Sequence, residues 1–416
     1  MTQKKGSLAT VFLAVLIDLM GFGLVLPLLP FYASTFHASA ISVGLLYSIY
    51  SLAQLIFSPL WGSLSDRIGR RPIMLLSTLG AMFAYLLFAL SHSLTLLFLS
   101  RLIAGVMGGN ISTAQAYAAD VTIPEERAKG MGMIGAAFGI GFVLGPALST
   151  LLIHPSFLKL LPVTVQNPYA LPGFFAAVMS FVSFLLVLFK LPETVTRSGK
   201  NAPPMVLRGG VFSKTFWVSI FETKPSGPRY FFPLLILSAF LLSLAQASLY
   251  SAFPLFCKFR LGMPAEKVGL QFVAMGLIAV AVQGGLIRYL VKIWSEENLF
   301  LTGNILLITG LALIPFASSP KFLTLFLSVM ALGGSLNGPT LNSLLSKQAD
   351  PAHIGRAMGT SQGISGLGRV VGPTWGGWLY GVSYPLPFVL TAAVVSITLG
   401  VGIKLKQWAK PAVPKS

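Results

Sequence analysis

The chain has 416 residues, of which 55% are hydrophobic and only 10% are charged, a composition that excludes an ordinary soluble domain. Its formal net charge is +18, but the lysines and arginines gather in short segments between apolar runs, which favours membrane orientation over nucleic-acid binding. The single cysteine, Cys257, excludes a disulfide framework or a cysteine metal cluster, and the four histidines are too scattered for a metal site.

Apolar runs of about 20 residues, the length that crosses a bilayer, follow one another along most of the chain. The first six predicted spanning helices are 8–34, 41–63, 72–91, 94–120, 128–153 and 170–190. Six more follow a long polar segment: 230–256, 265–291, 298–317, 320–346, 356–382 and 385–405. The first run is too long for the core of a signal peptide and is expected to remain as a span. The sequence therefore predicts an all-α membrane protein with twelve transmembrane helices.

The polar segment divides the predicted helices into two sets. We expect an N-terminal six-helix half at 1–190, a cytoplasmic basic linker at 191–229 and a C-terminal six-helix half at 230–416. Most lysines and arginines fall on the face that carries both termini and the linker, which makes that face cytoplasmic. The linker charge gives an orientation signal or, alternatively, binds anionic lipid.

The two sets share a glycine and proline pattern. Gly132, Gly141 and Gly145-Pro146 in the fifth predicted helix recur, 227 residues later, as Gly359, Gly368 and Gly372-Pro373 in the eleventh. Pro27 and Pro254 share the same offset. Two halves in one orientation are the parallel repeat of alternating-access transporters, with the substrate bound near mid-membrane.

The run from Gly62 to Pro72 packs four charges between two apolar segments, so it lies at a membrane face. Its pattern, Gly-x-Leu-x-Asp-Arg-x-Gly-Arg-Arg, resembles the loop signature of the major facilitator superfamily. The resemblance covers nearly the whole chain and extends to the twelve-helix drug:proton antiporters that include tetracycline efflux proteins. It implies the major facilitator fold, with two six-helix halves related by the parallel repeat.

Further segments carry this resemblance. The fifth predicted helix is similar to the antiporter signature, with Ser149-Thr150 in place of a glycine pair, and 18–27 is similar to the first helix of tetracycline exporters. The third predicted helix departs from those exporters at Ala84, where they carry an aspartate. This departure argues against a tetracycline–metal complex as the substrate.

Asp18 is the only charged residue between Lys5 and Asp66, and the other acidic residues lie in predicted loops or at helix ends. An ionisable residue inside a span is a functional candidate, and a carboxyl group whose exposure changes can bind and release a proton. The alternative is a structural role at a helix break. The resemblance implies that Arg101 of the fourth helix faces Asp18, as a modulator of the proton or as a structural partner.

The charged loop is expected to act as a gate, whose contacts form in one transport state and break in the other. The resemblance implies that Asp66 lies near the start of the eleventh helix and that Arg70 reaches Asp120, locking the outward-facing state. The candidate gate residues are Gly62, Asp66, Arg67, Gly69, Arg70, Arg71 and Asp120.

Small residues and polar residues within the spans complete the candidate site. Glycines permit close helix approach and prolines interrupt the hydrogen-bond ladder, which favours packing between the two halves. The helix-packing residues are Gly132, Gly141, Gly145, Pro146, Gly368, Gly372 and Pro373. The substrate-cavity candidates are Phe22, Tyr50, Gln54, Asn110, Gln115, Phe138, Gln246, Tyr250, Asn337, Gln362 and Arg369. Arg369 either attracts an anionic group or reaches the cytoplasmic interface.

These patterns predict a proton-coupled secondary active transporter that exports lipophilic small molecules by alternating access. The proton gradient supplies its energy without a cofactor or a metal, and we expect a monomer among the lipids of a bacterial inner membrane. The alternative is a proton-coupled symporter or facilitator for a metabolite or an organic anion. A non-transporting scaffold or sensor has no need of a carboxylate inside a span together with a gate. No pattern indicates an enzyme or a nucleic-acid partner.

Overall fold

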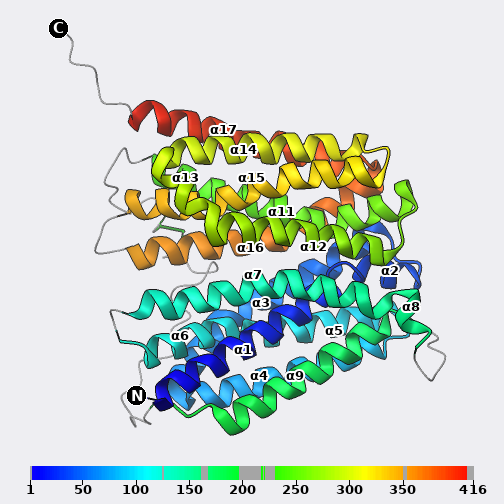
Figure 1. Cartoon of the computed structure of the whole chain (residues 1–416), viewed down its shortest axis with the longest axis vertical. Helices are drawn as coiled ribbons and strands as arrows, with labels where there is room; N and C mark the ends of the chain where they lie inside the picture. The colour runs from blue at the N-terminus through cyan, green and yellow to red at the C-terminus, as the bar shows by residue number, and fades with distance from the viewer. Residues whose placement is uncertain are drawn as a thin grey trace. The chain divides into compact units, whose positions relative to one another are not determined.

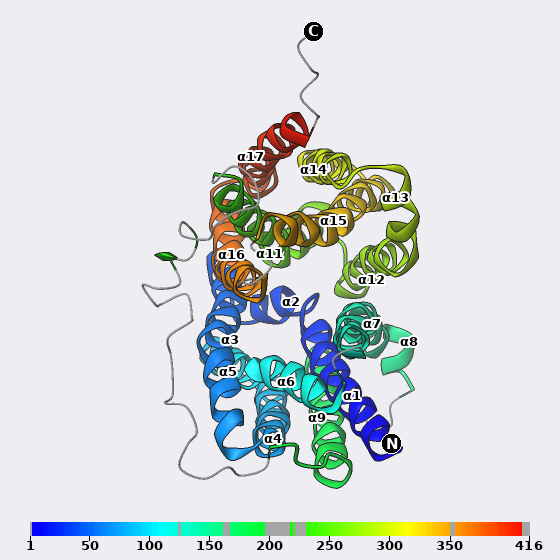
Figure 2. The same ribbon diagram turned by 90° about the vertical axis from the view of Figure 1, so that its left-hand side faces the viewer.

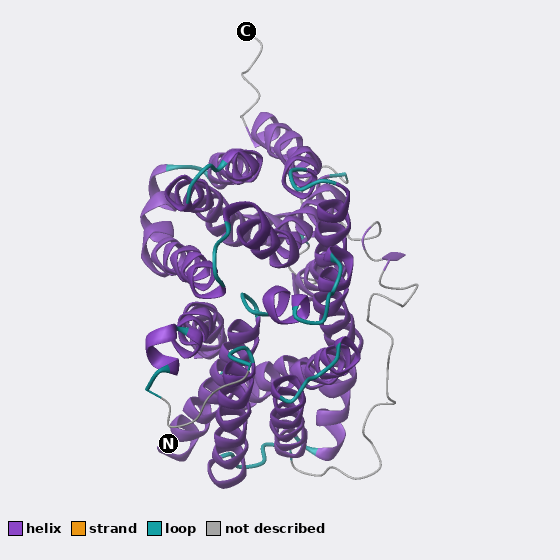
Figure 3. Ribbon diagram, turned by 90° about the vertical axis from the view of Figure 1, so that its right-hand side faces the viewer, coloured by secondary structure: helices purple, strands orange, loops and turns teal. Residues whose placement is uncertain are grey.

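The computed structural model describes residues 2–123, 126–160, 167–195, 217–218, 220, 230–349 and 354–409. Every regular element among these residues is a helix (Figure 3). Most of the predicted linker, 191–229, lies outside the described residues. The chain divides into two compact units: unit 1 comprises Met1–Leu207 and Phe253–Val273, and unit 2 comprises Arg208–Ala252 and Ala274–Ser416.

The helices follow the predicted spans closely (Figure 1). The first half contains α1 Thr2–Val25, α2 Leu29–Ser34, α3 Ala40–Ile68, α4 Arg70–Ala89, α5 Leu94–Met107, α6 Ile111–Val121, α7 Arg127–Ile153, α8 Pro155–Leu158 and α9 Ala170–Lys190. The second half contains α11 Phe231–Leu261, α12 Ala265–Ala281, α13 Ile287–Ile293, α14 Glu296–Leu313, α15 Pro320–Gln348, α16 Ile354–Val382 and α17 Leu386–Ala409.

Within the described residues, eleven helical segments are long and apolar enough to cross a membrane. The remaining predicted span, the eleventh at 356–382, corresponds to α16, which has 29 residues and is long enough to cross a membrane. It is less apolar because glycine, serine and threonine occupy many of its positions and Arg369 lies at its middle. The all-α architecture predicted from the apolar runs is confirmed.

Three of the predicted helices are interrupted. The first ends at Val25, and Pro27 lies in the turn before α2, since proline cannot continue the hydrogen-bond ladder. The fourth contains a 3-10 turn, Gly108–Asn110, between α5 and α6. The eighth contains a π-helical turn, Val282–Leu286, between α12 and α13. Such turns change the direction in which the following side chains point.

The charged loop is shorter than predicted. The helix α3 continues through the predicted loop to Ile68, and Gly69 alone separates it from α4. Gly69 has a φ of +107°, a conformation that side chains disfavour, so a glycine makes this one-residue connection possible. The charges of the loop signature therefore project from helix ends, which holds them in place.

In unit 1, α1 lies beside α7 and α9, and α4 lies beside α5 and α9 (Figure 2). A buried apolar cluster at these contacts includes Val11 and Val15 of α1, Tyr117 of α6 and Ala137 of α7. In unit 2, α14 lies beside α15 and α17 (Figure 1). These contacts hold the spans whose side chains form the candidate site.

Candidate functional site

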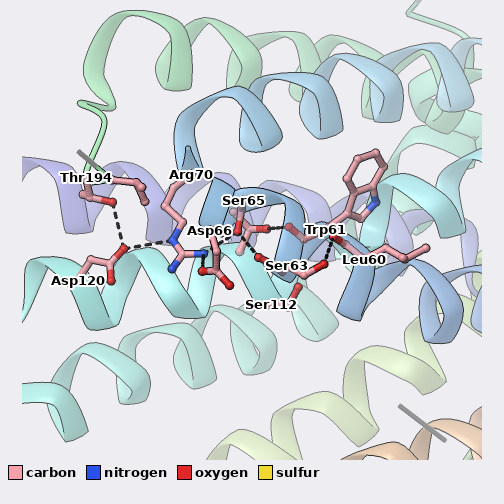
Figure 4. A network of polar contacts seen from close by, with 12 residues as sticks. Leu60, Trp61, Ser63, Ser65, Asp66, Arg70, Ser112, Asp120 and Thr194 are labelled. Carbon is pink, nitrogen blue, oxygen red and sulfur yellow. Dashed lines mark hydrogen bonds and ion pairs between the residues drawn. The ribbon is translucent and has the colours of Figure 1, made fainter. Parts of the chain in front are cut away.

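A cluster of charged side chains joins the ends of α3, α4 and α6 in unit 1 (Figure 4). Arg70, which is 8% exposed, lies at its centre. Its Nη1 pairs with Asp66 Oδ1 at 2.6 Å and donates to Ser65 Oγ at 2.6 Å. Its Nε donates to Asp120 Oδ2 at 3.1 Å, which is the contact expected from the sequence. One guanidinium thus uses its forked geometry to bridge two carboxylates.

Glu193, just beyond α9, caps the first turn of α4. Its Oε1 accepts from the Arg70 amide at 2.9 Å, and its Oε2 accepts from the Arg71 amide at 3.1 Å. A carboxylate at this position satisfies amides that have no partner within the helix and complements the positive helix end. A Cβ on Gly69 would lie 2.7 Å from Glu193 Cδ, so Gly69 also makes room for the cap. Thr194 Oγ1 extends the cluster by donating to Asp120 Oδ2 at 3.1 Å.

The remaining residues of the loop signature also lie within unit 1. Arg71 Nη2 donates to the Leu188 carbonyl at 2.6 Å. Arg67 is partly buried in the last turn of α3, and Gly62 packs against Ser112 of α6. The contact of Asp66 with the start of the eleventh span would join the two units and stays a prediction.

Inside the spans, Asp18 is held by an amide. Asn110, which is 1% exposed, donates from Nδ2 to Asp18 Oδ2 at 2.8 Å. Among the described residues, no hydrogen-bond partner is found for Asp18 Oδ1 or for Asn110 Oδ1, and both atoms are buried. Asn110, predicted to line the substrate cavity, binds the candidate proton carrier in the structure.

The 3-10 turn that carries Asn110 is fixed by side chains from neighbouring spans. Trp61 Nε1 donates to the Val106 carbonyl at 2.6 Å, Ser77 Oγ to the Met107 carbonyl at 2.6 Å and Gln54 Nε2 to the Gly108 carbonyl at 3.0 Å. Backbone carbonyls near a helix break need such partners because hydrocarbon offers none. Gln54, predicted to line the substrate cavity, therefore supports this turn.

Arg101 does not form the predicted ion pair with Asp18 in the described part of the chain. It is 2% exposed, its Cζ lies 5.0 Å from the centroid of Phe88 and 5.8 Å from that of Tyr85, and its Nη2 donates to Ser100 Oγ at 3.2 Å. Tyr85 is the physical reason: its ring contacts Arg101, and its hydroxyl lies against Gly21, one turn beyond Asp18. Cation–π contacts replace the expected carboxylate.

A small cavity opens beside Asp18. It is lined by Asp18, Leu19, Tyr50, Ala81, Tyr85, Ala104, Met107, Gly108, Asn110 and Ile111, and leaves about 20 Å³ for the centre of a water molecule. This space holds about one water and is too small for a drug-sized ligand. Tyr50 lines it and also contacts the Phe22 ring, with centroids 5.0 Å apart.

The other candidates in unit 1 have different surroundings. Phe138 packs against the buried cluster of α1, α6 and α7, so it contributes to packing. Gln115 is exposed on α6. At the tetracycline-exporter aspartate position, Ala84 is fully buried, and the described residues include no group of three His, Cys, Asp or Glu that could hold a metal.

The packing glycines of α7 lie against a neighbouring helix of their own unit, while their role in packing the two halves together stays a prediction. A Cβ on Gly141 would lie 2.7 Å from Leu19 Cβ, and one on Gly145 would lie 2.6 Å from Gly23 Cα, so both glycines face α1. Gly132 has no atom within 4 Å of its added Cβ. The glycine spacing therefore predicts the close approach of two helices, and the helix that α7 approaches at Gly141 and Gly145 is α1 of the same unit.

The matching glycines of unit 2 also pack against a helix of their own unit. Cβ atoms added to Gly368 and Gly372 would meet α11 at the Phe240 carbonyl, 2.7 Å away, and the Leu244 carbonyl, 2.6 Å away. Ser251 Oγ donates to the Pro373 carbonyl at 2.7 Å, while Pro146 of α7 lies opposite Gly23. Both prolines lie inside unbroken helices.

Four polar candidates of unit 2 lie on α11 and α16. Arg369 is exposed at the middle of α16 and lies within electrostatic reach of Tyr250 of α11. Gln246, one turn before Tyr250, and Gln362 are also exposed. Asn337 of α15 is 2% exposed and packs against Gly303, so it is a buried packing residue in this structure.

Long apolar helices in two compact units, with a carboxylate held inside one span, define a polytopic membrane protein of the transporter class. The sequence profile described as Major Facilitator Superfamily matches residues 11–299 and again 235–415. The chain belongs to this superfamily, whose members are transporters rather than enzymes.

Similar proteins and a similar solved structure agree with this family assignment. The chain is 31% identical over 375 residues to tetracycline resistance protein class B of Escherichia coli, covering 89% of this chain and 88% of that protein. It is 28% identical over 413 residues to multidrug resistance protein 1 of Bacillus subtilis, covering 99% and 98%. The crystal structure of the human organic anion transporter MFSD10 matches with a TM-score of 0.68 and 26% identity, over 96% of this chain and 99% of that chain.

Two residues of the site were not expected from the sequence. The sequence does contain a clue to the role of Glu193, because this residue is an isolated acid directly after the sixth span, on a face where its neighbours are basic. The sequence contains no such clue for Tyr85, because an aromatic residue in a span usually contacts lipid or packs against another helix. Their importance depends on contacts over long sequence separations.

Proposed function

We propose that this chain is a proton-driven exporter of lipophilic small molecules that works by alternating access, with Asp18 as the proton carrier. The observation that carries the proposal is the Asp18 carboxylate, held within the first span by Asn110 and partly buried among apolar side chains. The similarity to tetracycline and multidrug resistance proteins supports drug-like cargo.

The energetics suit this role. One proton that moves across about 100 mV releases about 2.3 kcal/mol, which supports tens-fold accumulation of an exchanged substrate. A carboxylate in a span is costly while charged and much less costly once protonated, so loading and release of a proton favour different conformations. The proton gradient then suffices as the energy source, without a cofactor.

Arg101 receives a changed role in this proposal. Since Tyr85 contacts the guanidinium and reaches α1 near Asp18, we assign Arg101 to holding Tyr85 in place. Its charge acts on the proton site across the tyrosine ring. The carboxylate keeps a neutral partner, Asn110, in its immediate contact.

The charged cluster around Arg70 is assigned to the gate. Its helix ends hold Asp66 and Asp120 in fixed positions, so a movement of α3 against α6 must break an ion pair. The basic segments orient the chain with both termini and the linker in the cytoplasm. The bacterial relatives support an inner-membrane location, and two six-helix halves form a complete transport unit, which supports a monomer surrounded by lipid.

The test is compound-driven proton release from energised inverted vesicles, followed with a pH-sensitive dye. A panel of lipophilic cations, neutral drugs and organic anions is added to vesicles with the native chain or Asp18→Asn. We expect a response to lipophilic compounds that falls to the background level in Asp18→Asn, because the variant has no titratable group at this site.

Glu126→Gln removes an exposed acid that lies between two candidate spans and is the matched control, with the native response expected. Equal amounts of folded protein are verified by size-exclusion chromatography. A response that persists in Asp18→Asn removes this residue from the coupling role and contradicts the proposal.

A second candidate function is proton-coupled symport or facilitated transport of an organic anion. Arg369 favours it, since a cation at mid-span is costly in lipid and is expected to face the bundle interior or a cavity. The similarity to the human organic anion transporter MFSD10 supports the same cargo. For this function, Arg369→Gln is expected to reduce uptake of organic anions at least about tenfold, and Arg369→Lys to retain part of it. Uptake of radiolabelled anions at two pH values separates the two functions.

A further inference from the structure

Asp18 and Asn110 share an unusual hydrogen-bonding deficit. The two side chains already form one hydrogen bond, from Asn110 Nδ2 to Asp18 Oδ2 at 2.8 Å. Their other oxygens, Asp18 Oδ1 and Asn110 Oδ1, are both buried and have no partner among the described residues. Buried polar atoms are nearly always hydrogen-bonded, so a joined pair with two unsatisfied atoms calls for an explanation. Both atoms are acceptors when Asp18 is ionised, so neither can bond to the other until a hydrogen is added to the carboxylate.

We propose that Asn110 is the residue that binds the protonated form of Asp18, with the proton on Oδ1 and shared with Asn110 Oδ1. This inference rests on the proposed function and identifies where the coupled proton resides. The carboxyl O–H donates to the amide oxygen while the amide N–H donates to the other carboxyl oxygen, which closes a two-bond ring. Loading forms an O–H bond at Oδ1 with a proton supplied by water, and the charge of Asp18 changes from −1 to zero. Release returns the proton to water and leaves the electron pair on Oδ1.

Asn110 is positioned to accept this bond by a rigid support. Side chains of α3 and α4 bind the carbonyl groups of Val106, Met107 and Gly108, so the 3-10 turn keeps its place when α1 moves. Asn110 thus acts as a positioning residue on one side of a two-bond contact, and Asp18 lies on the other. Separation of α1 from the turn breaks both bonds and exposes the proton for release.

The other polar groups that face Asp18 suit a neutral pair. Tyr50 and Tyr85 line the cavity across from it, and Arg101 lies beyond the Tyr85 ring. A guanidinium in direct contact favours the ionised form of Asp18. An amide, in contrast, forms one hydrogen bond with the ionised carboxylate and two with the protonated carboxyl group. The cavity has space for about one water, enough to bring a proton to Oδ1.

Infrared difference spectra of the full chain in lipid vesicles, recorded between acidic and alkaline buffer, test this inference. Protons are the only added ligand. We expect the carbonyl stretching band of a protonated carboxyl group that disappears in Asp18→Asn. The same band moves to higher frequency in Asn110→Leu, because the carbonyl loses its hydrogen bond. The half-maximal pH of the band also moves in Asn110→Leu, an effect that a residue with a purely structural role does not produce.

Gln115→Leu is the matched control, since it removes an exposed amide from the same span, five residues beyond the 3-10 turn; the band of this variant stays at the native position. Asn110→Ser, which retains one hydroxyl, gives an intermediate shift and covers the case in which the leucine variant does not fold. An unmoved band in folded variants at Asn110, or a band that survives Asp18→Asn, overturns the inference. The vesicle transport assay tests the proposed function independently: loss of proton release in Asp18→Asn together with an unmoved band overturns this inference alone.

Discussion

Replacement of Gly145 by valine is expected to abolish folding of unit 1. A Cβ at this position would lie 2.6 Å from Gly23 Cα and 2.8 Å from the Met20 carbonyl oxygen, both backbone atoms of α1 that have no rotamer to change. Overpacking against flexible side chains costs about 1–3 kcal/mol, and a rigid backbone contact exceeds that range. We expect a destabilisation of about 3 kcal/mol or more, seen as loss of the monodisperse peak and of the thermal transition in detergent.

Gly132→Val is the matched control on the same helix. Nothing lies within 4 Å of a Cβ at Gly132, so the variant is expected to melt at the native temperature. The glycine signature alone treats the two positions alike, whereas the structure separates them. Equal stability of the two variants contradicts the α1–α7 packing described above.

Replacement of Arg70 by lysine is expected to destabilise the charged cluster almost as much as replacement by methionine. Arg70 uses Nε for Asp120 and Nη1 for Asp66 and Ser65, and a single ammonium group has no fork with which to bridge these acceptors. Asp66 is 55% exposed and Asp120 34%, so solvent screening reduces the effect to about 1–2 kcal/mol. Denaturation in detergent at low and high salt measures it, with a smaller difference from the native chain at high salt.

Arg71→Lys provides the comparison. Within the part of the chain that the structure describes, the Arg71 side chain donates one hydrogen bond, from Nη2 to the Leu188 carbonyl, which a lysine donor can replace. We expect nearly native stability. If Arg70→Lys were as stable as Arg71→Lys, the bridging geometry would be unnecessary and the gate assignment would lose its structural basis.

The spans were predictable because a bilayer imposes one simple constraint, a run of about 20 apolar residues. The predicted helices 72–91 and 170–190 differ from α4 and α9 by at most two residues at each end. The charged loop was less predictable, since helical geometry continues through polar residues wherever tertiary contacts stabilise it. Glu193 and Asp120, more than 45 residues from Arg70 in sequence, supply those contacts.

The candidate site was also predictable from the sequence only in part. Composition and pattern alone established a membrane transporter with one carboxylate inside its spans, because the cost of charge in hydrocarbon makes such a residue stand out. They did not establish its partner. Arg101 was the expected choice by charge, yet Tyr85 contacts the guanidinium and a 3-10 turn delivers Asn110 instead. Which side chains meet depends on helix rotation and on turns stabilised by distant donors. Side-chain periodicity limits which face of a helix is buried, but packing in three dimensions decides what that face contacts.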